Sequence, residues 1–270
     1  VVWNHRLRRA VQRKTSELHQ EKELINVTIH SIRDGVIAAV GNDLPEEGAL
    51  KVIDASGLLV TPGIVDIHTH LFATGGNPNA WAGEYSVFPD GFSVRSGVTT
   101  MVDAGSAGWR NFDLFRASVI DRARTRVFAF LNIASYGMIS DLIEQTPSDF
   151  DPEAAVKKVE RHRDVLVGIK TAHYWGPGWE PVESAVGAGR MSDLPVMVDF
   201  GYFRRERPYW QLVTEKLRAG DISTHCFRAP VPVVDGRGKI YPYLFAARER
   251  GVLFDLGHGG GSFLFGNAVP

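Results

Sequence analysis

Seven short apolar runs recur along this chain, and each run closes with a side chain that can bind a ligand or take part in a reaction. The closing residues are His68, Asp103, Asn132, Lys170, Asp199, His225 and His258. Consecutive members lie 26 to 38 residues apart, which is the length of one strand followed by one helix. A chain that repeats this unit folds into a parallel sheet covered by helices.

Helical patterns occupy four of the intervals, with apolar residues three or four positions apart. They cover residues 112–124, 153–164, 209–217 and 241–250. An open doubly wound sheet would place its ligands at one switch point, whereas a (β/α)₈ barrel gathers its active site at the ends of all its strands. Because every run closes with a polar residue, the sequence predicts an α/β fold of the (β/α)₈ barrel type.

The predicted barrel covers residues 61–270 and holds seven of its eight units. The same rhythm would end the eighth unit near residue 290, roughly one further strand and helix along. We therefore expect a barrel that is incomplete at the C-terminus and a chain that is inactive when residues 1–270 are expressed alone.

Two further segments precede the barrel. Residues 1–23 carry six basic and three acidic side chains, and we interpret them as a basic N-terminal segment, either disordered or a solvated helix, with an amphipathic targeting segment as the alternative. Over residues 24–60, two β-rich runs (24–30 and 36–40) flank Asp34-Gly35 and predict a hairpin. A further short strand is expected over 50–53.

Composition excludes several classes of protein. The chain has 30 basic and 31 acidic residues, so nothing in its charge attracts nucleic acid. No apolar run reaches the roughly 18 residues of a membrane-spanning helix. The single cysteine, Cys226, excludes an internal disulfide. We expect a small-molecule substrate and no membrane partner, and a cytoplasmic location is favoured because the sequence has no secretory-signal core; homo-oligomer formation stays open.

The pair His68 and His70 is the first candidate metal site. Residues i and i+2 of a strand point to the same side, so both imidazoles can face one ion. Imidazole suits zinc and related divalent metals. A lone HxH pair occurs often by chance, but further polar residues at later strand ends, Asp199 and His225, strengthen the metal hypothesis.

The segment from Pro62 to His70 resembles the PGxxDxHxH signature of the amidohydrolase superfamily. Four later segments resemble blocks of its dihydroorotase and deacetylase-like branch, in the same order along the chain. They are Gly97–Thr100, Gly168–Lys170, Ser223–His225 and Gly257–Gly261. The resemblance implies that residues 24–60 form part of a small β-sandwich domain.

The same resemblance implies two divalent metal ions, with zinc favoured, and a carbamate formed from Lys170 and CO₂. Its metal ligands would be His68, His70, the Lys170 carbamate, Asp199 and His225. Without the resemblance, the favoured interpretation of Lys170 is a salt-bridge partner or a charge at the barrel rim, since an ammonium group cannot bind a cation.

The chain departs from the family at two places. Asp199 stands where most relatives place a histidine, and a carboxylate can still bind zinc, although it favours harder ions. The family's catalytic aspartate at the end of strand eight has no counterpart in these 270 residues. His258 is expected to contact the substrate or a metal ligand, with a turn-stabilising role as the alternative.

These observations predict a metal-dependent hydrolase that cleaves an amide, N-acyl or ester bond with a metal-activated water. Three alternatives stay open: a hydrolase of cyclic amides similar to dihydroorotase, a barrel relative without catalytic activity, and an isomerase or lyase that uses Lys170 as a Schiff base. Metal content separates the first two, and borohydride trapping would reveal the third.

Overall fold

The computed structural model describes residues 28–31, 37–41, 44–49, 51–55, 57–72, 86–139, 142–199, 204–258 and 262–268. They fall into two compact units that divide between Pro62 and Gly63. In the first unit, β1 (Thr28–Ser31) pairs antiparallel with β2 (Ile37–Gly41), which is the hairpin expected from the sequence. The interpretation of residues 1–23 lies outside the described residues.

The strand expected over 50–53 is absent from its described part, residues 51–53. Val52 and Ile53 are 56% and 71% exposed, and no described strand pairs with them. A strand needs a hydrogen-bonded neighbour to be stable. The prediction therefore fails here because the short apolar run has no partner strand.

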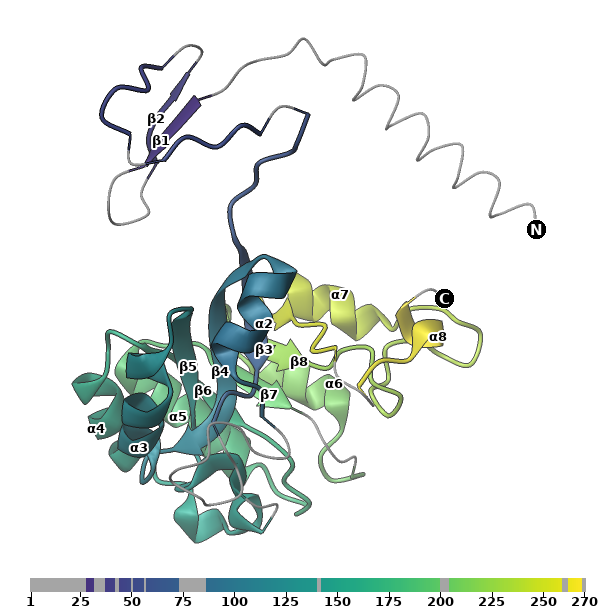
Figure 1. Cartoon of the computed structure of the whole chain (residues 1–270). Coiled ribbons are helices and arrows are strands. Elements are labelled where there is room, and N and C mark those ends of the chain that lie inside the picture. The colour runs from purple at the N-terminus through teal and green to yellow at the C-terminus, as the bar shows by residue number, and fades with distance from the viewer. Residues whose placement is uncertain are drawn as a thin grey trace. The chain divides into compact units, whose positions relative to one another are not determined.

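The second unit is built on a parallel sheet in which each strand pairs with the next one along the chain. Its strands are β3 (Ile64–Thr69), β4 (Val98–Gly108), β5 (Arg126–Asn132), β6 (Leu166–Thr171), β7 (Val196–Asp199), β8 (Ile222–Thr224) and β9 (Leu253–Phe254). They coincide with the seven apolar runs, and the sheet curls into a half-barrel (Figure 1). The predicted fold class is confirmed.

The half-barrel is open between its two edge strands, β3 and β9. Ile64 and Val65 on β3 are each 55% exposed, and Leu253 on β9 is 53% exposed. Apolar side chains on barrel strands are normally covered on both faces. Exposure at both edges is what seven strands of an eight-stranded barrel present.

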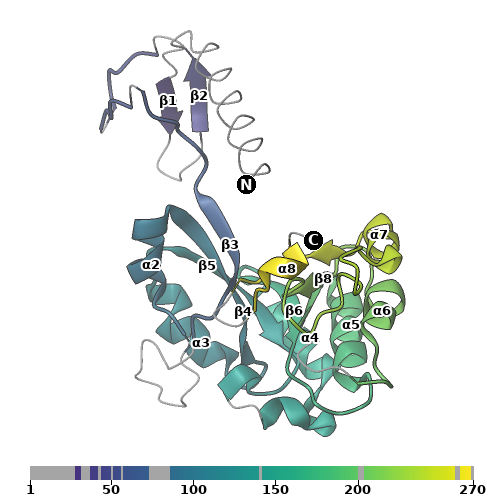
Figure 2. The same ribbon diagram turned by 90° about the vertical axis from the view of Figure 1, so that its right-hand side faces the viewer.

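The helices between successive strands lie on the outer side of the sheet (Figures 1 and 2), and one further helix, α8, follows the last strand. They are α2 (Pro89–Ser96), α3 (Phe112–Ser118), α4 (Pro152–Arg161), α5 (Glu180–Ser192), α6 (Tyr209–Gln211), α7 (Pro242–Glu249) and the short α8 (Phe265–Ala268). Short 3₁₀ turns cover Ile120–Arg122, Gly137–Ile139, Ile143–Gln145 and Pro147–Asp149, and a π-helical turn, Leu212–Lys216, continues α6. Among the described helices, none is long and apolar enough to cross a membrane.

The helix ends follow local sequence signals. The Asp151 side chain accepts a hydrogen bond from the Ala154 amide at 3.0 Å and caps α4, whose first residue is Pro152. The helix α5 escaped sequence prediction because glycines and alanines blur its apolar period. Gly189 in α5 is required, since a Cβ there would lie 2.7 Å from Val196 on β7.

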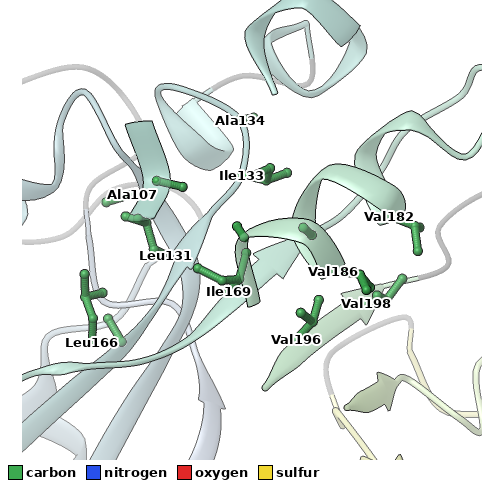
Figure 3. Packing of buried hydrophobic residues seen from close by; sticks show 14 of the residues in the cluster. Ala107, Leu131, Ile133, Ala134, Leu166, Ile169, Val182, Val186, Val196 and Val198 are labelled. Carbon is green, nitrogen blue, oxygen red and sulfur yellow. The ribbon is translucent and has the colours of Figure 1, made fainter. Parts of the chain in front are cut away.

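Side-chain alternation along the strands separates two apolar clusters. The larger lies between sheet and helices and includes Leu131, Ile169, Val186, Val196 and Val198 (Figure 3). The smaller is formed by Val102, Ala104, Phe130, Met197 and Ile222. Neighbouring residues on a strand point to opposite faces, so these five share the inner face of the half-barrel.

The inner face also carries the polar strand ends. Asn132 lies two residues after Phe130, Asp199 two after Met197, and Thr224 two after Ile222, so each continues the inner row. The carboxyl ends of parallel strands meet at one end of a barrel. The alternation of side chains thus places these polar groups close together, at the carboxyl ends of the strands and next to the inner apolar cluster.

Candidate active site

The strand ends bring five predicted metal ligands together. The His68 ring lies with its centroid 5.7 Å from that of His70 and 4.7 Å from that of His225. His225 Nε2 is 3.5 Å from Asp199 Oδ2. Lys170 pairs in register with Met197 of β7 and is 1% exposed, within electrostatic range of all three histidines.

His68 is held by two residues that follow it by more than 150 positions. Its Nδ1 lies 2.8 Å from Asp255 Oδ2 and 2.8 Å from the Thr224 hydroxyl, which itself donates to Asp255 at 2.5 Å. Burial and the nearby Lys170 lower the pKa of His68 despite Asp255. The ring is therefore neutral, carries its proton on Nδ1 and keeps Nε2 free to bind a metal.

The other two histidines are held in the same way. His70 Nδ1 is hydrogen-bonded to Ser106 Oγ at 3.1 Å, and His225 Nδ1 donates to the Gly257 carbonyl at 2.7 Å. Burial lowers the pKa of both rings, that of His70 to about 3 with help from Lys170. Gly257 is required at its position, because a Cβ there would lie 2.6 Å from His225 Nδ1.

Lys170 is a buried amine without a close carboxylate among the described ion pairs. Its Nζ donates to Met197 Sδ at 3.5 Å, a weak acceptor. Burial lowers the pKa of Lys170, which favours the neutral amine. Gly105, with φ +88°, leaves room for its stem, since a Cβ there would lie 2.5 Å from Lys170 Cγ.

Asp199 is 6% exposed and has cationic neighbours on both oxygens. Oδ2 lies 3.1 Å from His173 Nε2, and Oδ1 lies 3.5 Å from Arg228 Nη1. Burial alone would raise the pKa of this carboxyl, but the hydrogen bond from His173 holds it well below its ordinary value. Asp199 is therefore ionised.

His173 itself lies between two carboxylates. Its Nδ1 is 2.8 Å from Glu144 Oε2 on the opposite side of the ring from Asp199. Burial opposes protonation, yet the hydrogen bonds to Asp199 and Glu144 raise the pKa of His173 to about 10. In contrast to the three neutral histidines, this ring is a cation.

Asp103 and Asn132 brace the strand ends from inside. Asp103 is fully buried and accepts backbone hydrogen bonds from Leu71, Gly105 and Ser106 at 2.7–3.0 Å. Asn132 donates to the Gly105 carbonyl and to Glu144, and accepts from the Ala134 amide. These contacts use up the polar groups of both side chains, so their role is to shape the loops around Lys170.

His258 stands apart from the other predicted residues. It is exposed, and its ring contacts Phe263 with centroids 5.1 Å apart. Asp255, which directly follows β9 and lies three positions before His258, is the residue from this strand end that contacts His68.

Two arginines hold the loops nearby by hydrogen bonds to backbone carbonyls. Arg204 Nε donates to the Trp175 carbonyl at 2.5 Å, and Arg207 Nη2 donates to the Tyr174 carbonyl at 2.7 Å.

The donor set suits a divalent cation only in part. Among the described residues, no three His, Cys, Asp or Glu side chains form a ready metal-binding group. Three neutral imidazoles with anchored Nδ1 atoms and an ionised Asp199 are nevertheless ligand types that such an ion prefers. The residues present therefore fit a divalent metal.

Sequence reasoning missed four polar contributors: Ser106, Glu144, His173 as a site residue, and Asp255. Asp255 interrupts the apolar run Val252–Leu256, and an inward-facing polar residue inside a barrel strand is the signal that could have found it. Glu144 carries no such signal, because it lies in the short turn Ile143–Gln145 outside every strand.

Comparison with known proteins decides the family. No protein-family model matches the chain. A deacetylase of Agrobacterium fabrum is 34% identical over 248 residues, and a deacetylase of Brucella anthropi is 32% identical over 249, each alignment covering 86% of this chain. A dihydroorotase crystal structure superposes with a TM-score of 0.72 at 31% identity, covering 90% of this chain and 64% of that one. The chain belongs to the amidohydrolase superfamily.

This amidohydrolase chain also matches an adenine deaminase structure with a TM-score of 0.73 at 28% identity, over 90% of the chain and 65% of that structure. It spans 56% and 58% of the two deacetylases. The relatives are thus longer than the region that they share with this chain, and the printed activities belong to those longer proteins.

Proposed function

We propose that this chain is the metal-binding barrel of a hydrolase that cleaves a non-peptide C–N bond of an N-acyl compound, with deacetylation favoured. The observation that supports it best is the common anchoring of His68, His70 and His225. Each is held through Nδ1 and has a lowered pKa, so each is neutral and keeps Nε2 available as a metal ligand. The deacetylase relatives support the N-acyl class over cyclic amides.

Two divalent ions, zinc favoured, would be held by His68, His70, Asp199, His225 and a carbamate on Lys170. The buried amine of Lys170 favours its neutral form, which adds CO₂ and releases a proton to give the carbamate. The carbamate adds two oxygen atoms to the end of the Lys170 side chain, and these are donor atoms that the unmodified cluster lacks. When bound, such ions supply a nucleophilic water at neutral pH and polarise the scissile carbonyl.

Other residues of the chain orient the metal ligands and shape the space that the substrate would occupy. Asp255 and Ser106 orient the imidazoles of β3, while Asp103 and Asn132 fix the loops that cover Lys170. Trp175 is 39% exposed on the loop after β6 and can contact an acyl group. Trp179, on the same loop, packs instead against the outer core, and its ring faces Lys216.

The first prediction tests this function through Lys170→Ala. We expect the intact natural protein to carry about two divalent ions per chain, and its Lys170→Ala variant to lose at least one of them together with nearly all turnover of N-acetyl amino acids. Lys157→Ala, an exposed lysine on α4, is the matched control and should keep both properties. Mass-spectrometric metal analysis and release of acetate are the measurements.

Full metal content in Lys170→Ala would overturn the carbamate. Absence of metal from the wild-type protein would instead support a barrel relative without catalytic activity. Turnover of cyclic amides with no action on N-acyl compounds would move the substrate class to the dihydroorotase-like alternative.

A further inference from the structure

His173 joins two buried carboxylates across the site. Glu144 is 2% exposed and Asp199 is 6% exposed, and they lie against opposite nitrogens of the His173 ring at 2.8 and 3.1 Å. A ring nitrogen that faces a carboxylate oxygen must donate a proton to it, so both nitrogens of this ring are committed. His173 differs in this from His68, His70 and His225, whose Nδ1 atoms alone are hydrogen-bonded to anchors.

The chain around His173 is held in a conformation that ordinary residues avoid. Its φ is +53°, and the other described non-glycine residues with positive φ are Asp193, which ends α5, and His225 at the metal site. Such a backbone costs roughly 1–3 kcal/mol unless its surroundings enforce it. Gln145 supplies that enforcement, because its side chain donates to the His173 carbonyl and accepts from the Trp175 amide, each at 2.8 Å.

Glu144, on the other side of the His173 ring, is also held in place. Glu144 Oε1 accepts a hydrogen bond from Asn132 Nδ2 at 3.0 Å, and Asn132 closes β5. The path Asn132–Glu144–His173–Asp199 therefore runs from one strand end to another through groups that are all hydrogen-bonded. Asp199 Oδ2 also lies 3.5 Å from His225 Nε2, so the path ends at a predicted ligand pair.

We propose that His173 is a positioning residue of the metal centre, which holds Asp199 in its ligating orientation and is itself anchored by Glu144. The inference rests on the proposed function, in that Asp199 binds one of two ions. Hydrogen-bond partners of metal ligands fix the ligand's orientation, and their loss typically costs 10- to 100-fold in metal affinity. Asp199 with His173 behind it thus takes the place that the family gives to a single histidine.

The experiment is a double-mutant cycle on metal affinity. Zn²⁺ affinities of the wild type, His173→Ala, Asp199→Ala and the double variant are measured by competition with a chromophoric chelator, and Co²⁺ absorption spectra report the surroundings of each ion. Circular dichroism checks folding. His162→Ala is the matched control, since His162 also bridges two partners, Arg116 and Asp113, but on the outer helices.

We expect His173→Ala to weaken one of the two ions about 10- to 100-fold and to leave the other unchanged. Asp199→Ala should weaken the same ion, and the double variant should bind no worse than Asp199→Ala, because His173 has nothing left to position. His162→Ala should bind as the wild type does. His173→Gln carries one donor group where the ring has two, so it should lose affinity at the same ion by a smaller factor.

Wild-type affinity in His173→Ala overturns the proposal, and so does wild-type affinity in His173→Gln if the alanine variant does not fold. Additive losses in the double variant would also overturn it, because they make His173 an independent ligand. If the wild type binds two ions, either of these contradicting results rejects the role of His173 and leaves the proposed function intact. If the wild type binds no Zn²⁺, both the role of His173 and the proposed function are rejected.

Discussion

His70 and His173 lie in one site, yet their surroundings drive the two imidazoles in opposite directions. Burial and Lys170 lower the pKa of His70 to about 3, whereas Asp199 and Glu144 raise that of His173 to about 10 against its burial. His70 meets a neutral serine hydroxyl and His173 meets two carboxylates. Two carboxylate partners outweigh burial at His173, whereas burial prevails at His70 and also at His68, which has one carboxylate partner.

The comparison divides the site into two halves. At the end of β3 and directly after it, His68 and His70 are neutral and are hydrogen-bonded to Asp255 and Ser106. Beside β7, the ionised Asp199 is backed by a cationic His173. Asp199 and the imidazolium of His173 together carry the same formal charge as one neutral imidazole, but Glu144 adds a second carboxylate, so this half carries one more negative charge than a single imidazole would.

The largest expected effect concerns pH and the His173 half. A group whose pKa is raised by folding stabilises the folded protein below its unfolded value of 6.5, and this stabilisation is lost as pH rises toward about 10. Metal-free protein should therefore lose roughly 2–4 kcal/mol of unfolding free energy between pH 6.5 and 9.5, at about 1.4 kcal/mol per pKa unit. Urea unfolding of the wild type and of His173→Gln, with chelator present, measures the difference.

The His173→Gln curve should lack this pH-dependent loss, since the amide does not titrate. If both proteins changed in parallel over that range, the ring would not be a cation in the folded state, and the contrast between the halves would disappear.

The next effect concerns the β3 half. Asp255→Ala removes the carboxylate that fixes His68, and we expect about 10- to 100-fold weaker binding of the ion held by His68 and His70. The ion beside Asp199 should keep its affinity. Chelator competition measures both, and Asp121→Ala, an exposed carboxylate paired with Arg116, is the control.

Equal weakening of both ions in Asp255→Ala would show that the two halves act as one unit. An unchanged affinity would mean that the His68 ring is held by Thr224 alone.

The smallest effect is expected for Ser106→Ala. Its hydroxyl makes a neutral hydrogen bond to His70, and such bonds contribute about 0.5–1.5 kcal/mol, so the affinity of the same ion should fall roughly 2- to 10-fold. Ser118→Ala, whose hydroxyl bonds the Leu114 carbonyl on α3, serves as control. A loss as large as that of Asp255→Ala would contradict the ranking of charged above neutral partners.

The sequence predicted the strands well because each one is a short apolar run, and a buried strand has to be apolar on both faces. It also predicted which strand ends carry His68, Lys170 and Asp199, since position at the end of such a run is visible in one dimension. Helix α5 and the true ends of α3 were missed, because packing against the sheet, not local periodicity, defines them.

The partners of the strand-end residues could not be predicted. Glu144 reaches His173 across 29 positions, from a 3₁₀ turn with no apolar pattern. Asp255 reaches His68 across 187 positions, and only the curl of the sheet brings them together. Sequence patterns report which residues face inward, whereas contacts between inward-facing residues depend on the barrel's curvature.

The separation in sequence between His68 and its partners also sets the order in which parts of the site form during folding. Every strand of the sheet pairs with its immediate successor, so the sheet can grow unit by unit as the polypeptide is synthesised. His68 belongs to the first of these strands, but Thr224 and Asp255 follow it by 156 and 187 residues. The His68 ring thus gains Thr224 only when the sixth strand, β8, is in place and Asp255 only with the seventh, and the site is completed after most of the core that carries it.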